Sequence, residues 1–366
     1  MSVNAPESYP VPAAVLREYC ASIFVDAGVP AADAELVADS LVEANLRGVD
    51  SHGVSRVPIY IERIRRGLTD PDPDVRVVSE RGGALLIDGD NGMGQVVTQR
   101  AVDVAFDRLS EQRVVSVGIR NSNHYGAGAY FGRRAAERGA AVFLYGNAPS
   151  TMVAWGGRER FLGTNPYTFA VPAGDRAPVV LDMATSVVAR GKIILSSQLG
   201  QDIPEGWAVD VAGQPTTEAA AALEGSVLPF GGPKGYGIAL MIEIMAAVLS
   251  GANCGPEVGD LYDELERPQG VGAFLNLTDI TAFQPLSGFG DRITGLIDAI
   301  KLTAAEGSEV LIPGELEQRV ADARLRDGVP VPPAVAAALE KVAAKPFPTD
   351  NASQTAKETH EHRPRP

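Results

Sequence analysis

Residues 114–145 read VVSVGIRNSNHYGAGAYFGRRAAERGAAVFLY. An apolar run at 114–119 leads into a loop of small and polar residues, then a helical pattern at 127–138 and a second apolar run at 141–145. Short β-type runs that alternate with helical segments are typical of a sheet covered by helices. This stretch therefore predicts the sheet-containing part of the fold, with a polar loop between strand and helix.

The same alternation extends on both sides of this stretch. Three further β-type runs and one more helical pattern lie at 84–88, 168–171, 178–182 and 95–113. A later segment, Tyr236–Gly251, is apolar nearly all round, which predicts a buried helix.

Both ends of the chain have helical character instead. Leu16, Cys20, Ile23 and Phe24 recur at helical spacing, and helical patterns return after residue 290. We expect an α+β fold in which the two ends pack as one helical domain and the sheet region is inserted between them. The predicted parts are 1–80 (helical), 81–290 (α/β), 291–348 (return to the helical domain) and 349–366 (a disordered polar tail).

The composition is that of a globular protein. With 366 residues, of which 45% are hydrophobic and 21% charged, the chain is long enough for about two domains. Its formal net charge of −14 repels phosphate backbones and anionic lipid, so neither nucleic acid nor a membrane surface is an expected partner. The longest apolar run, Ile238–Ala252, contains Glu243 and is shorter than the roughly 20 residues that span a bilayer. The first twelve residues lack the pattern of a secretory signal.

Several common site motifs are absent. No Gly-x-Gly-x-x-Gly fingerprint, phosphate-binding loop, Gly-x-Ser-x-Gly or His-Glu-x-x-His sequence occurs, and the glycine cluster at 89–94 is interpreted as a turn between strand and helix. No tyrosine is followed four positions later by lysine; Tyr130, with Arg134, comes nearest. Two cysteines, Cys20 and Cys254, cannot form a disulfide framework or a cysteine-rich zinc site, which favours a reduced cytoplasmic location and no metal.

Only two histidines are candidates for proton transfer. Of the four histidines, His360 and His362 lie in the polar tail, which leaves His52 and His124. His124 belongs to RNSNHYGAG at 120–128, a predicted strand-to-helix loop of the kind where α/β proteins place their sites. The alternative is a turn rich in asparagine whose histidine is satisfied structurally.

His52 belongs to SHGVSRVPIY at 51–60. Arg56 and Tyr60 are four residues apart and share a helix face, with His52 just ahead of that helix. A guanidinium suits a substrate carboxylate, and an imidazole suits proton transfer. The alternative is a histidine that caps a helix beside a surface ion pair.

A glycine-rich turn opens the apolar helix, with the sequence PFGGPKGYG at 229–237. Lys234 at a helix N-terminus can help to hold an anion such as a cofactor phosphate, together with exposed N–H groups and the helix dipole. The alternative is a tight loop that only admits the helix.

Taken together, seven segments resemble the type-2 malate/L-lactate dehydrogenase family of NAD(P)H-dependent 2-oxo-acid reductases. In the family's order they are Ser51-His52-Gly53-x-x-Arg56, Asn121-Ser122-Asn123-His124-x-Gly126, Gly163-Thr164-Asn165-Pro166, Leu181-Asp182-Met183-Ala184-Thr185-Ser186, Ile203-Pro204-Glu205-Gly206-Trp207, Gly232-x-Lys234-Gly235-Tyr236-Gly237 and Ile312-Pro313-Gly314-Glu315. These segments lie between residues 51 and 315, and the resemblance as a whole extends from about residue 10 to 345, about nine-tenths of the chain. One departure is Gly272–Leu277, where the family has a more aromatic strand, which puts local packing or substrate fit in question.

The resemblance implies a fold unrelated to the Rossmann type, a homodimer, and NAD or NADP as cofactor. It makes His52 and His124 the proton-transfer candidates and gives Arg56 the substrate carboxylate, with Ser51 and Tyr60 beside it. The positions that match cofactor contacts are Ser150, Asp182, Met183, Ala184, Lys234, Pro313, Gly314 and Glu315.

The sequence thus predicts a cytoplasmic, metal-free dehydrogenase that moves hydride between a nicotinamide ring and C2 of a small 2-oxo or 2-hydroxy acid. A second possibility is reduction of a cyclic Δ1-imino-2-carboxylate. A third, from a different class, is a binding protein that has kept the fold and lost turnover. The residues leave the choice between NAD and NADP open.

Overall fold

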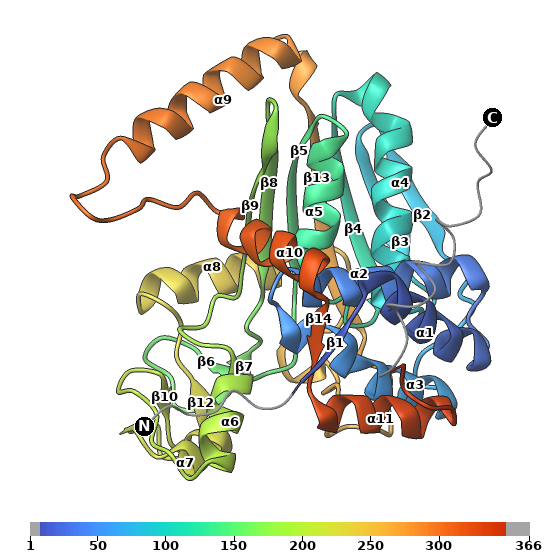
Figure 1. Cartoon of the computed structure of the whole chain (residues 1–366), viewed down its shortest axis with the longest axis vertical. Helices are drawn as coiled ribbons and strands as arrows, with labels where there is room; N and C mark the ends of the chain where they lie inside the picture. Colours follow the sequence, from blue (N-terminus) through green and yellow to red (C-terminus); the bar gives the residue numbers. More distant parts are fainter. Residues whose placement is uncertain (1–7, 349–366) are drawn as a thin grey trace, which may run out of the picture. The chain divides into compact units, whose positions relative to one another are not determined.

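The computed structural model describes residues 8–348, which form two compact units. One unit joins the chain up to Arg65 with the chain from Leu316 onward, and the other comprises Arg66–Glu315. Helices and mixed sheets together make an α+β fold, as predicted (Figure 1). The tail at 349–366, predicted to be disordered, lies outside the described residues.

The first unit is helical and contains both ends of the described chain. Its strands and α-helices are β1 (Tyr9–Val11), α1 (Ala13–Asp26), α2 (Ala31–Leu46), α3 (Val57–Arg65), α10 (Glu315–Asp327), β14 (Val329–Val331) and α11 (Pro333–Ala343). Strands β1 and β14 pair antiparallel. The hydroxyl of Tyr19 on α1 donates to the carbonyl of Lys345 at 3.0 Å, so a helix near the start of the chain binds a segment near its end.

The second unit is built on a seven-stranded sheet. In spatial order its strands are β2 (Arg76–Arg81), β3 (Ala84–Asp88), β4 (Val114–Ser122), β13 (Val271–Asp279), β5 (Ala140–Gly146), β8 (Tyr167–Ala173) and β9 (Arg176–Met183). Among these described strands β3 and β4 run parallel and the other neighbouring pairs are antiparallel. This order differs from the doubly wound parallel sheet of Rossmann folds.

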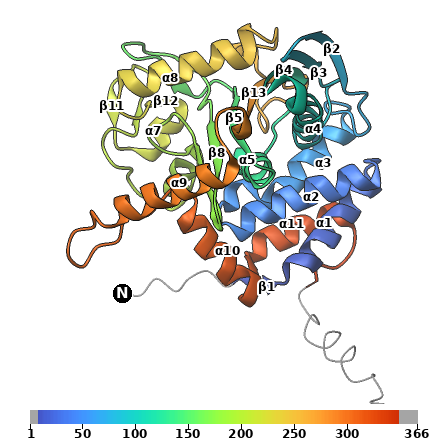
Figure 2. The same ribbon diagram turned by 90° about the horizontal axis from the view of Figure 1, so that it is seen from above.

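Helices cover both faces of this sheet (Figure 2). On one face lie α4 (Gly94–Gln112) and α5 (Gly128–Glu137), and on the other lies η3 (Ile244–Val248), a π-helical turn that continues α8 (Pro233–Glu243). The missing side chain of Gly128 lets α5 approach β8, because a Cβ there would lie 2.0 Å from Oγ1 of Thr168.

The prediction of a buried helix at 236–251 is wrong for one of its faces. Leu240, Ile244 and Val248 are 38%, 47% and 63% exposed, whereas Ile242 and Ala246 are fully buried. One side of this helix packs on the sheet, while the other side is exposed to solvent in the single chain. A helix that is apolar on all sides is therefore not always buried within its own chain. Within residues 8–348 no helix combines the length and apolar character needed to cross a membrane.

The units divide at different places from the expected ones. The expected division at residue 80 falls inside β2, which pairs with β3. The expected division at residue 290 falls inside α9 (Leu286–Lys301), which contacts β8. These contacts with the sheet place residues 66–80 and 291–315 in the second unit, which is called the central unit below because it is formed by the middle of the chain.

A smaller sheet in the second unit has no counterpart in the sequence expectations. Its five strands, in spatial order, are β11 (Pro215–Thr216), β10 (Ala208–Val209), β12 (Ser226–Val227), β6 (Met152–Val153) and β7 (Arg160–Leu162). With α6 (Arg190–Gln198) and α7 (Ala219–Glu224) they enclose a small core that includes Met152, Leu162 and Ile193. Strands of two or three residues are too short to show a period of two.

Candidate active site

The first histidine motif forms a turn in the helical unit. Two short 3-10 turns, η1 (Asp50–His52) and η2 (Val54–Arg56), connect α2 to α3. The buried Asn45 holds them, since its Nδ2 donates to Asp50 Oδ1 at 2.6 Å and its Oδ1 accepts from the N–H of Val54 at 2.8 Å. Gly53 is required at this place because a Cβ would lie 2.1 Å from Asn45 Oδ1.

A side chain from the C-terminal part of the chain completes this turn. Nη1 of Arg324, on α10, pairs with Asp50 Oδ1 at 2.7 Å and also donates to the carbonyl of Asn45. The sequence expectations included neither Asn45 nor Arg324. A lone arginine 274 residues away from its partner gives no local signal of the pairing.

Three of the residues predicted for substrate binding and proton transfer are in contact in this turn. Oγ of Ser51 lies 3.0 Å from Nδ1 of His52, and Nε of Arg56 donates to the carbonyl of Ser51 at 2.7 Å. Tyr60 follows one helical turn later and is buried on α3. Burial lowers the pKa of His52 from 6.5 to about 4, and the charge of Arg56 acts in the same direction. The imidazole of His52 is therefore neutral at pH 7.

The second histidine lies just beyond β4 in the central unit. Strand β4 continues to Ser122, so the segment expected as loop begins three residues later. The N–H of His124 donates to Oε1 of Gln269 at 3.1 Å, and Nε2 of this glutamine donates to the carbonyl of Gly259 at 3.1 Å. Gln269 is 1% exposed, so a buried amide fixes the backbone of His124. The sequence expectations did not include Gln269.

The glycine cluster at 89–94 braces the same loop. It forms the turn between β3 and α4 that was predicted. Nδ2 of Asn123 donates to the carbonyls of Asn91 and Gly92 at 3.0 and 2.8 Å. The cluster is thus structural, and it supports the residue that precedes His124.

A backbone contact sets the tautomer of His124. The N–H of Gly126 donates to Nδ1 of His124 at 3.4 Å, in a turn where Gly126 has a φ of 80°. A nitrogen that accepts a hydrogen bond carries no proton, so the neutral ring carries its proton on Nε2. Nε2 is therefore the nitrogen through which a neutral His124 would donate a proton.

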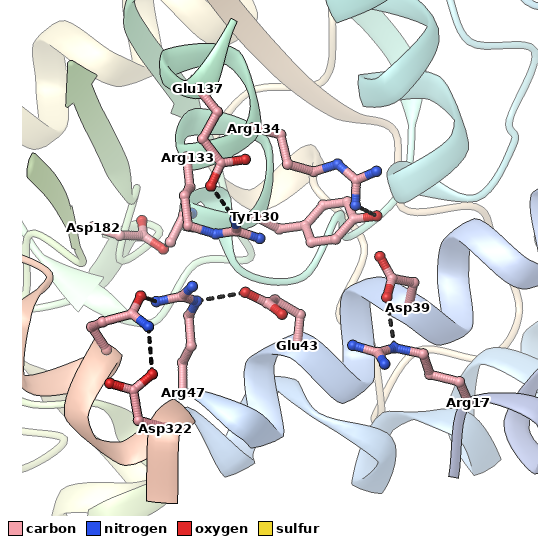
Figure 3. A network of polar contacts seen from close by, with 12 residues as sticks. Arg17, Asp39, Glu43, Arg47, Tyr130, Arg133, Arg134, Glu137, Asp182 and Asp322 are labelled. Carbon is pink, nitrogen blue, oxygen red and sulfur yellow. Dashed lines mark hydrogen bonds and ion pairs between the residues drawn. The ribbon is translucent and has the colours of Figure 1, made fainter. Parts of the chain in front are cut away.

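Asp182, at the end of β9, binds the start of α5. Its Oδ2 accepts from the N–H of Ala129 and its Oδ1 from Oγ1 of Thr168, both at 2.8 Å. The carboxylate stabilises the helix start that follows the His124 loop. Figure 3 shows Asp182 beside this helix, together with the Arg134 guanidinium that donates to the Tyr130 hydroxyl at 2.9 Å. That tyrosine is buried, which makes the pair a contact within α5.

The segments predicted to contact the cofactor lie side by side in the central unit. Thr185, which follows Asp182-Met183-Ala184, donates through its N–H to the carbonyl of Thr164 at 2.8 Å. Its own carbonyl accepts from the N–H of Phe230, in the turn that leads to Lys234, at 3.0 Å. The carbonyl of Pro313 accepts from the N–H of Val180 on β9 at 3.0 Å.

Several other residues predicted to contact the cofactor bind neighbouring residues of the chain. Oγ of Ser150 donates to the carbonyl of Phe161 at 2.5 Å, and the thioether of Met183 accepts from the Tyr167 hydroxyl at 3.3 Å. Ala184 is half-buried. Gly314, at a φ of 94°, lies against Val180, and Glu315 pairs with Lys301 at 2.7 Å.

The turn before α8 has fewer N–H groups that could bind an anion than the sequence predicts. Pro233 has no N–H, and the N–H groups of Lys234, Gly235 and Tyr236 already donate to carbonyls of the turn. The exposed ammonium group of Lys234 and the helix dipole remain available. These groups fit a phosphate, and a carboxylate such as that of the exposed Asp182 is the kind of acceptor that suits a sugar hydroxyl, so the cluster suits a nucleotide.

Sequence comparison identifies relatives of the chain over most of its length. The family model described as malate/L-lactate dehydrogenase matches residues 11–340. An L-sulfolactate dehydrogenase from Methanocaldococcus jannaschii is 41% identical over 293 residues, covering 80% of this chain and 84% of the relative. A malate dehydrogenase from Pyrococcus horikoshii is 38% identical over 345 residues, covering 92% and 95%.

Two further relatives carry a cofactor in their names. A (2R)-3-sulfolactate dehydrogenase (NADP+) from Chromohalobacter salexigens is 36% identical, covering 78% of this chain and 84% of the relative. A ureidoglycolate dehydrogenase (NAD+) from Escherichia coli is 34% identical, covering 79% and 83%.

Solved structures share the fold. The sulfolactate dehydrogenase of Methanocaldococcus jannaschii aligns with a TM-score of 0.87 at 36% identity, covering 92% of this chain and 98% of that one. A Δ1-piperideine-2-carboxylate reductase from Pseudomonas syringae aligns with a TM-score of 0.83 at 27% identity, covering 91% and 99%.

Proposed function

Since the chain belongs to the malate/L-lactate dehydrogenase family, we propose that it transfers hydride between NAD or NADP and C2 of a small 2-oxo or 2-hydroxy acid. It is an NAD(P)-dependent dehydrogenase, and the proposal concerns its substrate and the residues that act on it. The observation that carries the proposal is the pair of histidine motifs, each held in a defined geometry by buried amides.

Arg56 is proposed to bind the substrate carboxylate. A guanidinium forms paired, charge-assisted hydrogen bonds with a carboxylate, which orients the acid as well as holding it. Ser51 and Tyr60 are proposed to add hydrogen bonds beside it. An oriented acid aligns its C2 carbon for reaction, and such alignment is a large part of catalysis.

His124 or His52 is proposed to exchange the proton that accompanies hydride transfer. Reduction of a carbonyl leaves an alkoxide that needs a proton, and a positioned acid contributes about 10²–10⁴-fold. The two histidines differ in state: His52 is neutral at pH 7 and suits a base in the oxidation direction, whereas Nδ1 of His124 accepts a backbone hydrogen bond, which leaves Nε2 to carry the proton of the neutral ring.

The cofactor is proposed to bind along the cluster formed by Ser150, Asp182-Met183-Ala184, Lys234 and Pro313-Gly314-Glu315. When bound, it supplies or accepts the hydride. Lys234 would hold a phosphate through its exposed ammonium group, and Asp182 would accept from a ribose hydroxyl. The relatives' names support either NAD or NADP.

The test is a spectrophotometric panel. The purified chain is mixed with NADH or NADPH and with 2-oxo acids that carry methyl, carboxymethyl, sulfomethyl and ureido substituents, and the near-ultraviolet absorbance of the reduced cofactor is followed. We expect rapid loss of absorbance with at least one acid. No turnover with any acid, while binding of the nucleotide is confirmed by fluorescence, would favour the third possibility, a binding protein without catalysis.

A cyclic Δ1-imino-2-carboxylate is the second candidate substrate. The similarity to the Δ1-piperideine-2-carboxylate reductase supports it, and so does the neutral His52, because a basic imine needs less help from an acid. Adding piperideine-2-carboxylate and pyrroline-2-carboxylate to the same panel separates the two classes, since the preferred class gives the higher kcat/KM.

We also propose that the chain forms a homodimer in the cytoplasm. The open apolar side of α8 and η3, with Leu240, Ile244 and Val248, supports burial against a second copy. Free cysteines, one of them buried, are consistent with a reducing compartment.

A further inference from the structure

Glu243 is a buried acid that the proposed reaction does not use. It is the last residue of α8 and is 4% exposed. Nδ2 of Asn165 donates to its Oε2 at 2.7 Å, and the N–H of Gly255 donates to its Oε1 at 2.7 Å. Nδ2 of Asn147 reaches the same Oε1 at 3.4 Å.

The two asparagine partners turn their NH₂ groups toward Glu243, so each of them requires an acceptor oxygen there. Oδ1 of Asn165 accepts from the N–H of Ala148 at 3.1 Å, so its NH₂ group must face Glu243. Oδ1 of Asn147 accepts from the N–H of Gly272 at 2.9 Å, which fixes that amide in the same sense. Three N–H donors converge on the two oxygens of the Glu243 side chain. A carboxylate fits here, whereas a glutamine would turn its own NH₂ group toward a donor.

A π-helical turn follows Glu243 in the chain. Directly after Glu243 the helix widens into η3, where the N–H of Leu249 donates to the carbonyl of Ile244 at 2.8 Å, a spacing of five residues. π-Helical turns of this kind occur frequently at functional sites. Asn165, which donates to this carboxylate, is fully buried and has a φ of 24°, a backbone conformation that needs support from its surroundings.

Hydrogen bonds lead from Asn165 to three of the candidate cofactor segments. Its Oδ1 holds the N–H of Ala148, two residues before Ser150. Its neighbour Thr164 accepts from both the N–H and the Oγ1 of Thr185, at 2.8 and 2.9 Å, directly after Ala184.

The third segment is the turn of Lys234. The carbonyl of Thr185 binds the N–H of Phe230 in that turn, at 3.0 Å. Nδ2 of Asn165 also donates to the carbonyl of Ala239 on α8, the helix that Lys234 opens, at 3.0 Å.

We propose that Glu243 is a positioning residue for the nucleotide: its carboxylate fixes Asn165, and Asn165 fixes the loops that carry Ser150, Ala184 and the turn of Lys234. This inference rests on the proposed function, because those loops matter only if they hold NAD or NADP. Loss of the carboxylate should then raise the nucleotide dissociation constant, and this effect should not be explained by a lower thermal stability of the fold.

The experiment compares Glu243→Gln with Leu109→Ala. Leu109 is buried on α4, outside this network, so its truncation destabilises the same unit without touching the loops. Dissociation constants for NADH and NADPH are measured by nucleotide fluorescence, KM for the accepted acid by turnover, and the thermal midpoint by calorimetry. For Glu243→Gln we expect a nucleotide Kd raised about 10- to 100-fold and a KM for the acid changed less than about threefold, since the loss of charge-assisted hydrogen bonds costs this much. For Leu109→Ala we expect a lower midpoint and an unchanged Kd.

Two results would overturn the inference. One is wild-type nucleotide affinity in Glu243→Gln, and the other is a loss of affinity in Leu109→Ala that follows its loss of stability. If Glu243→Gln does not fold, Glu243→Asp keeps the charge but shortens its reach, and it should show the same split between Kd and KM. Failure of the wild-type chain to bind either nucleotide is a separate result, which refutes the proposed function itself.

The thiol of Cys254 reports the charge independently of nucleotide. Burial raises the pKa of Cys254, and the carboxylates of Glu243 and Glu257 add to this. In Glu243→Gln the alkylation of Cys254 by iodoacetamide should therefore reach half its maximal rate at a lower pH than in the wild type. An unchanged alkylation profile would show that Glu243 carries no charge and would contradict the inference.

Discussion

At His52, burial and the charge of Arg56 both oppose protonation in the folded chain. Its pKa is lowered to about 4, whereas an unfolded histidine titrates near 6.5. Between these values the unfolded chain binds a proton that the folded chain does not, so folding is weakened as pH falls through this window. The stabilising contribution of the neutral ring is complete above pH 6.5 and is lost by about pH 4.

This predicts a specific pH dependence of stability. Between pH 7 and pH 5 the free energy of unfolding of the wild type should fall by about 1–2 kcal/mol more than that of His52→Gln, which cannot titrate. Urea unfolding at the two pH values measures the difference. Equal losses in both proteins would mean that His52 is readily protonated in the folded chain.

A second prediction at this scale concerns turnover. Replacing the histidine that exchanges the proton, His124 or His52, with alanine should lower kcat by about 10²–10⁴-fold with little change in the thermal midpoint. His360→Ala, outside the described residues, serves as the control. Normal turnover in both His52→Ala and His124→Ala would exclude histidine as the proton donor.

The sequence motifs could be predicted, but the distant residues that hold them in place could not. The motifs around His52, His124 and Lys234 are recognisable because their residues are adjacent in the chain. Their supports are not: Asn165 binds Glu243 across 78 residues, and Gln269 binds His124 across 145. A buried polar pair of this kind has no periodicity or spacing, so the fold itself is needed to find it.

At the scale of elements, the turn that carries His52 depends on α10. Arg324 is the link, through Asp50 and the carbonyl of Asn45. Arg324→Ala should cost about 1 kcal/mol of stability and raise KM for the acid severalfold, because Ser51, His52 and Arg56 lose a support for their turn.

Arg326→Ala is the matched control on the same helix. Arg326 donates only to the carbonyl of Asp322 among the contacts seen in residues 8–348, and its loss should change stability by less than about 0.5 kcal/mol. Thermal melts and acid saturation curves of both variants test the comparison. Identical behaviour of the two would show that α10 does not support the turn.

Elements were predictable in proportion to their length. The helical spacing of Leu16, Cys20, Ile23 and Phe24 identified α1, and apolar runs identified β3 and β5. The five short strands of the smaller sheet were missed because their pairing is decided by partners distant in the chain. Helix α8 was recognised as a helix but not as one with an open face, since its apolar pattern is the same on both sides.

At the scale of the whole molecule, this open face predicts the oligomeric state. Val248→Glu places a charge on the exposed apolar side of η3, and burying an unpaired charge in an interface costs several kcal/mol. We expect this variant to be monomeric in light scattering, while the wild type is a dimer. Val78→Glu, on the exposed strand β2, is the control and should remain dimeric. A dimer that survives Val248→Glu would place the interface elsewhere.

The reaction that we propose passes hydride between the nicotinamide ring and C2 of a carboxylic acid. The most direct measurement uses NADH or NADPH deuterated at the transferable position of C4, together with the acid or cyclic imine that gives the highest turnover, and locates the label in the product by mass spectrometry and NMR. We expect one deuterium in the product, bound to C2. A product with no deuterium at C2, formed while the cofactor is oxidised, would contradict it.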